Sequence, residues 1–548
     1  MRLSPVAEWL VLALAVIYVV LTLLPCISTP PGRDQGTYLT VGNSLLHGKV
    51  LYRDIWDNKP PAIFYVSAAV GAVFGRVFWS PAAMDILLAA LGCLLLYRLV
   101  RPLLGVFGAS VALILYAAWH SRFMYYWIAQ PEMYQGVCAL GICLLLRWQG
   151  IHWRLRYVLA GLLMAFAFLL KYTFAVAVPF LLLMALLDME QLGARPPRLA
   201  LRASWRECLL RCGVVLGACA AAVLLAIAGL AVQGAWPAFY ESQFVVLPRY
   251  AAEAVKYEPH YLRLALIRLG GVLPPFVLGP LAAAAILAYF RRNLPRFMPL
   301  LLAAFAVLST AVVQVRFHDY YFTGCYPFLA AAGGYTAVAL LELLQQGADA
   351  LRRRGLRVAV VLLWVAVLNF CFLPLPDEYV RELLRYHQLS LWCKSPAVSY
   401  ASYPGAISVE FLDGQIEVLD YLRQNARPED KVFLWGSNSL VYFISGHEPP
   451  TRFPLNLGLI SRWSPPEWLP EAAQQVERAA PTYFIVTRGD QLRTITYSDL
   501  DSEQFLQSFP ALRDYLAQEY VPVRHMKNFE IYRRRDAGTP QERVPQIP

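Results

Sequence analysis

The chain has 548 residues, of which 58% are hydrophobic and only 16% are charged. Soluble globular proteins carry about 25% charged residues, so a string of ordinary soluble domains is excluded. The apolar residues occur in blocks of about 20, the length that crosses a bilayer core. The composition therefore predicts a polytopic, α-helical membrane protein.

The net charge of +11 does not indicate a nucleic-acid partner, because the basic residues are confined to particular short loops. These loops lie at residues 98–101, 147–156, 195–211, 291–296 and 352–357. They are alternate loops between apolar blocks, as the positive-inside rule requires of cytoplasmic loops. The ten cysteines lack CxxC or Cys/His ligand spacing, so no metal site, disulfide framework or cofactor is predicted.

The apolar blocks predict about eleven transmembrane helices. The first begins in the cytoplasm and is expected to remain uncleaved, because no small-residue cleavage site follows it. The expected spans are 6–26, 81–100, 105–120, 131–147, 155–170, 172–188, 208–231, 266–290, 297–315, 320–343 and 356–374. An odd number of spans places the tail on the external side of the membrane, opposite the N-terminus.

The composition changes after the last span, and four regions are predicted. Residues 1–375 form the transmembrane domain, 376–404 a linker, 405–535 an external (periplasmic) α/β domain and 536–548 a disordered tail. Short apolar runs predict buried strands, and helical spacing predicts the helices between them. The expected strands are 431–435, 482–487, 520–525 and 529–533, and the expected helices are 413–426, 467–480 and 502–518.

The loop at residues 27–80, between the first two spans, is unusually rich in ionisable groups. Between residues 33 and 61 it contains three aspartates, basic residues that include Arg33, Arg53 and Lys59, and a rigid Pro60-Pro61 pair. Clustered charge beside a membrane indicates a functional site, although solvated connecting loops can also be charged. Residues 60–78 are expected to form an amphipathic helix at the membrane interface.

This loop contains D-x-x-x-Y followed by G-x-x-Y-x-D-x-x-D-x-K-P-P. The motif residues are Asp34, Tyr38, Gly48, Tyr52, Asp54, Asp57, Lys59, Pro60 and Pro61. The pattern resembles the first external loop of bacterial relatives of protein O-mannosyltransferases and the lipid A aminoarabinose transferase. Weaker matches follow at Gln130-Pro131-Glu132, at Lys171, at R-F-H-D-Y-Y (316–321), and in the tail at 432–436 and 481–486.

The resemblance implies a membrane glycosyltransferase of the C-type fold in a bacterial cytoplasmic (inner) membrane. Such an enzyme moves a sugar from a polyprenyl-phosphate carrier to a hydroxyl of a lipid, glycan or protein acceptor outside the cytoplasmic membrane. The reaction requires a carboxylate base near the acceptor and cations near the departing phosphate. The expected partners are therefore this donor, the acceptor and membrane lipids.

The family position of the catalytic aspartate corresponds to Asp34, which is the predicted base. The family often has Asp-Glu where this chain has Asp34-Gln35. An alternative role for Asp34 is to cap a helix. Lys59 is the predicted phosphate ligand, with a snorkelling interfacial lysine as the alternative. Several relatives have Glu where this chain has Asn58, so no metal ligand is expected there.

The remaining candidates are assigned to phosphate binding or to support. Arg316 and His318 are expected to bind phosphate, unless they belong to an interfacial aromatic belt. Glu132 is expected to orient the acceptor or pair with Lys171, or else to be an ordinary helix N-terminal carboxylate. The other supporting residues are Tyr38, Tyr321, and Asp54 and Asp57, expected to be structural partners of Arg53 and Lys59.

Two other functions compete with the enzyme. A lipid or solute transporter would show duplicated halves with interrupted spans, and the sequence has no such duplication. A non-catalytic envelope-assembly protein of the same fold would not need to retain Asp34 and Lys59. The glycosyltransferase is therefore the preferred interpretation.

Overall fold

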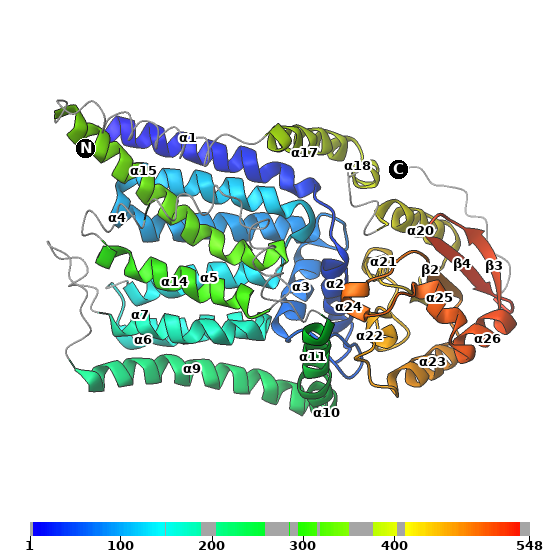
Figure 1. Cartoon of the computed structure of the whole chain (residues 1–548). Helices are drawn as coiled ribbons and strands as arrows, with labels where there is room; N and C mark the ends of the chain where they lie inside the picture. The colour runs from blue at the N-terminus through cyan, green and yellow to red at the C-terminus, as the bar shows by residue number, and fades with distance from the viewer. Residues whose placement is uncertain are drawn as a thin grey trace. The chain divides into compact units, whose positions relative to one another are not determined.

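The computed structural model describes residues 4–147, 150–187, 204–257, 284, 294–314, 318–349, 376–402 and 411–537 (Figure 1). The chain divides into two compact units, each built from segments far apart in the sequence. The first unit contains Met1–Ile27, Asp85–Leu225 and His260–His387, and the second contains Ser28–Met84, Ala226–Pro259 and Gln388–Pro548.

The first unit is helical. Its helices, some of which continue into the second unit, are α1 (Pro5–Leu23), α4 (Ser80–Trp127), α5 (Pro131–Arg147), α6 (Trp153–Leu170), α7 (Val178–Leu186), α9 (Trp205–Val232), α14 (Leu294–Val312), α15 (Tyr326–Asp349) and α17 (Pro376–Lys394), with 3₁₀ segments η1 (Leu24–Ser28), η2 (Tyr172–Ala177) and η4 (Asp319–Cys325). Four described segments are long and apolar enough to cross a membrane: Pro5–Ser28, Ser80–Ser121, Trp153–Leu170 and Trp205–Val232. The protein is a multi-pass membrane protein.

Most predicted spans coincide with helices, and some differ in form. The predicted spans 81–100 and 105–120 are the two legs of α4, which bends at Gly105, where φ is 68°. Pro102 lies just before this bend, and proline interrupts the helical hydrogen bonds. The predicted span 172–188 starts as the 3₁₀ turn η2 before it becomes α7. The span predicted at 356–374 and, apart from residue 284, the one at 266–290 lie outside the described residues, so the count of eleven stays a prediction.

Close backbone approaches hold the helices of the first unit together. A Cβ atom added at Gly136 would lie 2.6 Å from the carbonyl oxygen of Gly324, and one added at Gly334 would lie 2.3 Å from that of Gly108. Membrane helices associate through such small residues, because lipid provides no hydrophobic driving force between them. The glycines in these apolar blocks therefore mark helix contacts.

The second unit contains a mixed sheet with the order β1-β2-β4-β3. Its strands are β1 (Val432–Trp435), β2 (Tyr483–Thr487), β3 (Tyr520–His525) and β4 (Phe529–Arg534), close to the predicted positions. β1 and β2 are parallel and fully buried, whereas β4 pairs antiparallel with both β2 and β3. Strands buried on both faces read as continuous apolar runs, which is why the sequence revealed β1 and β2.

Helices cover both faces of this sheet. The helices are α18 (Pro396–Ala401), α20 (Leu412–Asn425), α21 (Leu440–Ser445), α22 (Leu457–Ile460), α23 (Trp468–Ala479), α24 (Arg493–Thr496), α25 (Ser502–Gln507) and α26 (Pro510–Glu519). One core contains Phe433, Trp435 and Phe484 with residues of α23 and α26. The other contains Val432, Leu434 and Ile485 with residues of α20 and α21. Successive side chains along a strand point to opposite faces of the sheet, so consecutive residues of β1 and β2 lie in opposite cores.

The charged loop belongs to this second unit, together with the segment that follows α9. The loop forms α2 (Arg33–Leu46) and α3 (Ala62–Phe74), and the other segment forms α10 (Trp236–Tyr240), a π-helical turn η3 (Glu241–Val246) and α11 (Leu247–Tyr257). α3 provides the helix predicted within residues 60–78. The domain limits given by the sequence analysis, including the linker at 376–404 and the disordered tail, stay predictions.

Candidate functional site

The predicted base Asp34 lies in the first turn of α2. Gly32 is the N-cap, and its backbone amide donates a 3.1 Å hydrogen bond to the side-chain oxygen of Gln35. A carboxylate in the first helical turn is favoured by the helix dipole. The N-cap position is thus occupied by Gly32, and Asp34 has Arg33 as a neighbour, with 3.9 Å between Nε and Oδ1.

Two close contacts fix α2 within the second unit. A Cβ atom added at Gly42 would lie 2.5 Å from the backbone nitrogen of Ala68 on α3, and one added at Gly36 would lie 2.8 Å from Cβ of Leu440 on α21. The hydroxyl groups of Thr37 and Ser439 are 3.0 Å apart. α2 is therefore held between a helix of its own loop and a helix of the tail.

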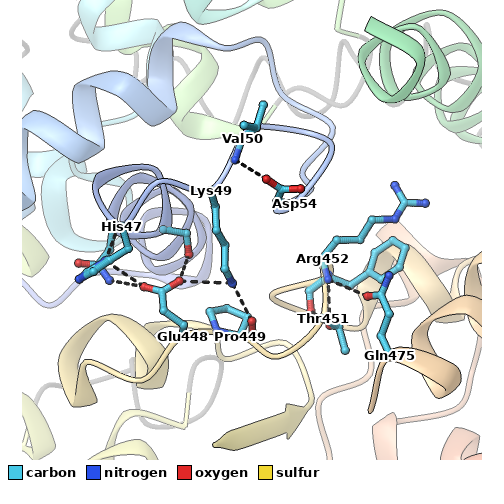
Figure 2. Close-up of polar contacts among 12 residues, drawn as sticks. His47, Lys49, Val50, Asp54, Glu448, Pro449, Thr451, Arg452 and Gln475 are labelled. Carbon is cyan, nitrogen blue, oxygen red and sulfur yellow. Dashed lines mark hydrogen bonds and ion pairs between the residues drawn. The ribbon is translucent and has the colours of Figure 1, made fainter. Parts of the chain in front are cut away.

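The end of α2 is bound by a single carboxylate from the tail, that of Glu448 (Figure 2). Asn43 donates to one oxygen at 2.9 Å, and the hydroxyl of Ser44 donates to the other at 2.5 Å. Lys49 adds an ion-pair contact at 3.4 Å, and Nδ1 of His47 lies 3.2 Å from the other carboxylate oxygen. The four residues that contact Glu448 lie at the C-terminal end of α2 or just after it. The helix dipole disfavours a carboxylate at this end, so these side chains must stabilise the Glu448 carboxylate.

Lys59 follows a tight turn that is fixed by hydrogen bonds. The backbone amide of Lys59 donates to Oδ1 of Asp57 at 2.9 Å, and the hydroxyl of Tyr52 donates to the carbonyl oxygen of Lys59 at 2.8 Å. Tyr52 itself has a φ of 67°, a left-handed conformation that non-glycine residues rarely adopt. Strained backbone of this kind is often found at functional sites.

The two other aspartates of the loop have opposite environments. Asp54 pairs with Arg53 at 2.8 Å and accepts a hydrogen bond from the amide of Val50, which lowers the pKa of its carboxyl. Burial raises the pKa of the Asp57 carboxyl, against the opposing charge of Lys59, and the negative charge of Asp34 adds to the increase. Asp34, Asp57 and Lys59 are therefore electrostatically coupled within one unit.

The segment after α9 supports the turn that carries Lys59. The guanidinium of Arg53 donates to the carbonyl oxygen of Gln233 at 2.7 Å, and the hydroxyl of Ser242 donates to that of Asp57 at 3.3 Å. The buried ring of Tyr52 packs edge-on against Phe239, with ring centroids 5.5 Å apart. Sequence reasoning did not identify this segment, because its contacts are far apart in the chain.

A second group of candidates lies in the first unit. The ammonium of Lys171 donates to the buried carboxylate of Glu132, a pairing that the sequence analysis gave as one alternative. Lys171 also lies over the ring of Tyr321, with 4.3 Å between Nζ and the centroid. His318 stacks on Tyr320 with the centroids 5.7 Å apart. Arg316 lies outside the described residues.

The structure also contains a buried polar pair that sequence reasoning missed. His120 Nε2 lies 2.7 Å from Oδ2 of Asp85, and the backbone amide of Ala129 donates to Oδ1 at 2.9 Å. Both side chains are almost completely buried. The available signal was the occurrence of ionisable residues within apolar blocks, which usually marks a functional or structural partnership.

The predicted site residues thus form two groups. Asp34, Tyr38, Asp54, Asp57 and Lys59 belong to the second unit, and Glu132, Lys171, His318 and Tyr321 belong to the first. Among the described residues, no cluster of three or more His, Cys, Asp or Glu side chains could hold a metal ion. Within its unit, each group combines carboxylates with a cation, as acid–base and phosphate chemistry requires.

A known family model matches part of the chain, beginning at the end of the charged loop. Residues 58–202 match the family model described as dolichyl-phosphate-mannose-protein mannosyltransferase. Comparison with curated protein sequences gives no match.

Solved structures match over almost the whole chain. ArnT from Cupriavidus metallidurans bound to undecaprenyl phosphate is 15% identical, with a TM-score of 0.50 over 97% of this chain and 99% of that one. The same protein in the apo state is 16% identical, with a TM-score of 0.52 over 96% and 98%. The oligosaccharyltransferase AglB from Archaeoglobus fulgidus is 14% identical, with a TM-score of 0.43 over 88% and 70%. The chain has the fold of C-type membrane glycosyltransferases, as the loop motif predicted.

Proposed function

We propose that this protein is a membrane glycosyltransferase that moves a sugar from a polyprenyl-phosphate carrier to an acceptor hydroxyl. The observation that carries the proposal is the hydrogen-bonded turn of Asp57 and Lys59, which lies with Asp34 on the loop whose sequence resembles the family motif. The similarity to a structure bound to undecaprenyl phosphate supports a lipid-phosphate donor. The sugar is a hexose or a pentose, and the acceptor is a lipid, a glycan or a protein.

The reaction is a single displacement with inversion. The carboxylate of Asp34 accepts the proton of the acceptor hydroxyl. At the same time, the oxygen of that hydroxyl forms a bond to the anomeric carbon of the sugar. The bond between that carbon and the phosphate oxygen breaks, and the electron pair leaves with the phosphate. The ammonium of Lys59 stabilises the charge that develops on the phosphate. For Arg316 and His318, phosphate binding stays a prediction. No metal is required in this scheme.

The other candidates support these groups. Asp57 accepts a hydrogen bond from the backbone of Lys59 and so orients the turn. Asp54 holds Arg53, which reaches the segment after α9. The pair Glu132–Lys171 braces its helices beside Tyr321.

The test is sugar transfer by the purified full-length protein in lipid nanodiscs. Synthetic polyprenyl-phosphate sugars serve as donors and cell-envelope extract as acceptor. A general base contributes about 10²–10⁴-fold to a rate, so Asp34→Asn should slow transfer at least about a hundredfold. The exposed Asp514 on α26 provides a matched control, since Asp514→Asn makes the same chemical change outside the loop. Near-normal transfer by well-folded Asp34→Asn would refute the base assignment, and no transfer by the wild type from any donor would refute the function.

We further propose that the N-terminus is cytoplasmic and that the tail and the charged loop lie on the external face. Cys393 is the exposed cysteine among those described. A membrane-impermeant maleimide applied to intact spheroplasts should label the wild type and not Cys393→Ser. If labelling of Cys393 requires permeabilisation, the orientation is reversed.

A further inference from the structure

Three aromatic side chains form an exposed row on α10 and the π-helical turn that follows it. Trp236, Tyr240 and Phe244 are 46%, 51% and 57% exposed. The ring centroids of Trp236 and Tyr240 are 6.2 Å apart, and those of Tyr240 and Phe244 are 5.3 Å apart in a stacked arrangement. An exposed contiguous apolar surface of this kind indicates an interaction site.

The opposite face of the same segment is buried. Phe239 is 3% exposed and packs against Tyr52, and Ser242 donates to the carbonyl oxygen of Asp57. Glu241 accepts a 2.9 Å hydrogen bond from the indole of Trp468. One face of α10 and the π-helical turn is therefore packed within the second unit, while the aromatic row on the other face is exposed. A π-helical turn is rare and occurs frequently at functional sites.

The chain that precedes the row is a lipid-facing span. α9 has 28 residues, which gives a length of about 42 Å, close to the total thickness of a bilayer with its headgroups. Its large apolar side chains are largely exposed, and they include Leu209, Leu210, Leu224, Leu225 and Val232. Because α9 carries so many exposed apolar side chains along its length, lipid is the solvent that these side chains require.

The row stays beside the end of this span. Gly234, with a φ of 73°, ends α9, and the amide of Ala235 donates back to the carbonyl oxygen of Leu230 at 2.9 Å. This reversal sets Trp236 next to the last turn of α9, as Figure 1 shows for the start of α10. The row is thus at the level of the interfacial headgroup layer, which is the depth at which Trp and Tyr are enriched.

We propose that Trp236, Tyr240 and Phe244 insert into the interfacial layer of the bilayer and hold the Asp57–Lys59 turn at headgroup depth. The occupant of this surface is therefore lipid. The second half of the proposal rests on the proposed function, because the phosphate of a polyprenyl carrier lies at the same depth as the lipid phosphates. The aromatic row would then set the position at which Lys59 meets the donor.

The first experiment measures lipid contact without any assay of activity. A small fluorescent amino acid is placed at position 240 or 244 of the full chain in nanodiscs, and quenching is compared for nitroxide lipids and aqueous iodide. Leu216 on α9 serves as a lipid-exposed reference position, and the exposed Glu477 on α23 as a water-exposed one. Quenching by headgroup-labelled lipid with protection from iodide supports the proposal. Quenching by iodide, or protection from both quenchers by a covering protein surface, overturns it.

The second experiment tests the depth of the turn. The triple variant Trp236→Ser, Tyr240→Ser, Phe244→Ser should raise the donor KM about tenfold, equivalent to about 1.4 kcal/mol of binding, with unchanged thermal stability. Replacing the three residues by other aromatic residues should restore the KM. Lipid contact with an unchanged KM in the serine variant would overturn the role in donor positioning. Absence of transfer by the wild type would refute the proposed function and leave the quenching result standing.

Discussion

The ammonium of Lys171 donates a hydrogen bond to the carboxylate of Glu132, and the two form an ion pair among the helices of the first unit. The Glu132 side chain is 1% exposed, so Lys171 takes the place of water beside its carboxylate. Gln314 adds a contact at 3.5 Å to the same carboxylate oxygen. Removing one member of a buried pair leaves an uncompensated charge, which costs about 3–5 kcal/mol.

This relationship predicts a pattern of stability in three variants. Lys171→Met and Glu132→Gln should each lower the melting temperature, with the larger loss in Lys171→Met because the carboxylate is then unpaired. The melting temperature of the double variant, Lys171→Met with Glu132→Gln, should return most of the way to that of the wild type. Sugar transfer should recover with it. Thermal unfolding and transfer are measured on the same preparations. A stable double variant with no transfer would show that one of the two residues contacts substrate rather than bracing the helices.

Lys59→Ala should weaken the use of the lipid-phosphate donor, because the proposed charge on the departing phosphate loses its cation. Lys59→Arg keeps the charge and should retain part of the activity. Lys431→Ala removes an exposed lysine of the tail and is the matched control. The donor KM and the turnover number are measured for each variant. Unchanged donor dependence in Lys59→Ala would remove this residue from the phosphate site.

Glu448→Ala should reduce both stability and turnover, because Asn43 and Ser44 lose the acceptor that holds the end of α2. Loss of hydrogen bonds to a charged group costs about 1.5–3 kcal/mol each, less where solvent has access. In a double-mutant cycle on turnover, Asn43→Ala should add little to Glu448→Ala, since the two side chains form one contact.

The exposed Glu417 on α20 is the control, and Glu417→Ala should leave both quantities unchanged. Fully additive losses in the cycle would show that Glu448 acts through other contacts than those at the end of α2.

Asp57→Asn should change the pH dependence of stability. Burial raises the pKa of the Asp57 carboxyl, so the folded state favours the protonated form. The protonated Asp57 carboxyl therefore contributes fully to the stability of the wild type below the ordinary aspartate pKa. This contribution is lost as the pH rises through the raised pKa of the folded state. The melting temperature of Asp57→Asn should match that of the wild type in acid and exceed it increasingly towards neutral pH. A constant difference across the pH range would show that burial does not govern this carboxyl.

Local patterns in the sequence determined the class of protein and many of its elements. Hydropathy identified the helical spans, because a span must be apolar whatever its neighbours are. β1 and β2 appeared as apolar runs because both of their faces are buried. The loop motif led to the assignments of Asp34 and Lys59, which stay predictions. It also led to the glycosyltransferase fold, and the solved structures support that fold.

Tertiary structure alone decided which distant groups meet. Asn43 and Glu448 are 405 positions apart, and no periodicity or spacing connects them. The same holds for Asp85 and His120, and for Ser242 and Asp57. Hydropathy and helical periodicity arise from near neighbours in the chain, so they can be read in order along it. A hydrogen bond between remote side chains depends on how whole helices pack, and only the folded chain brings its donor and acceptor within 3 Å or so.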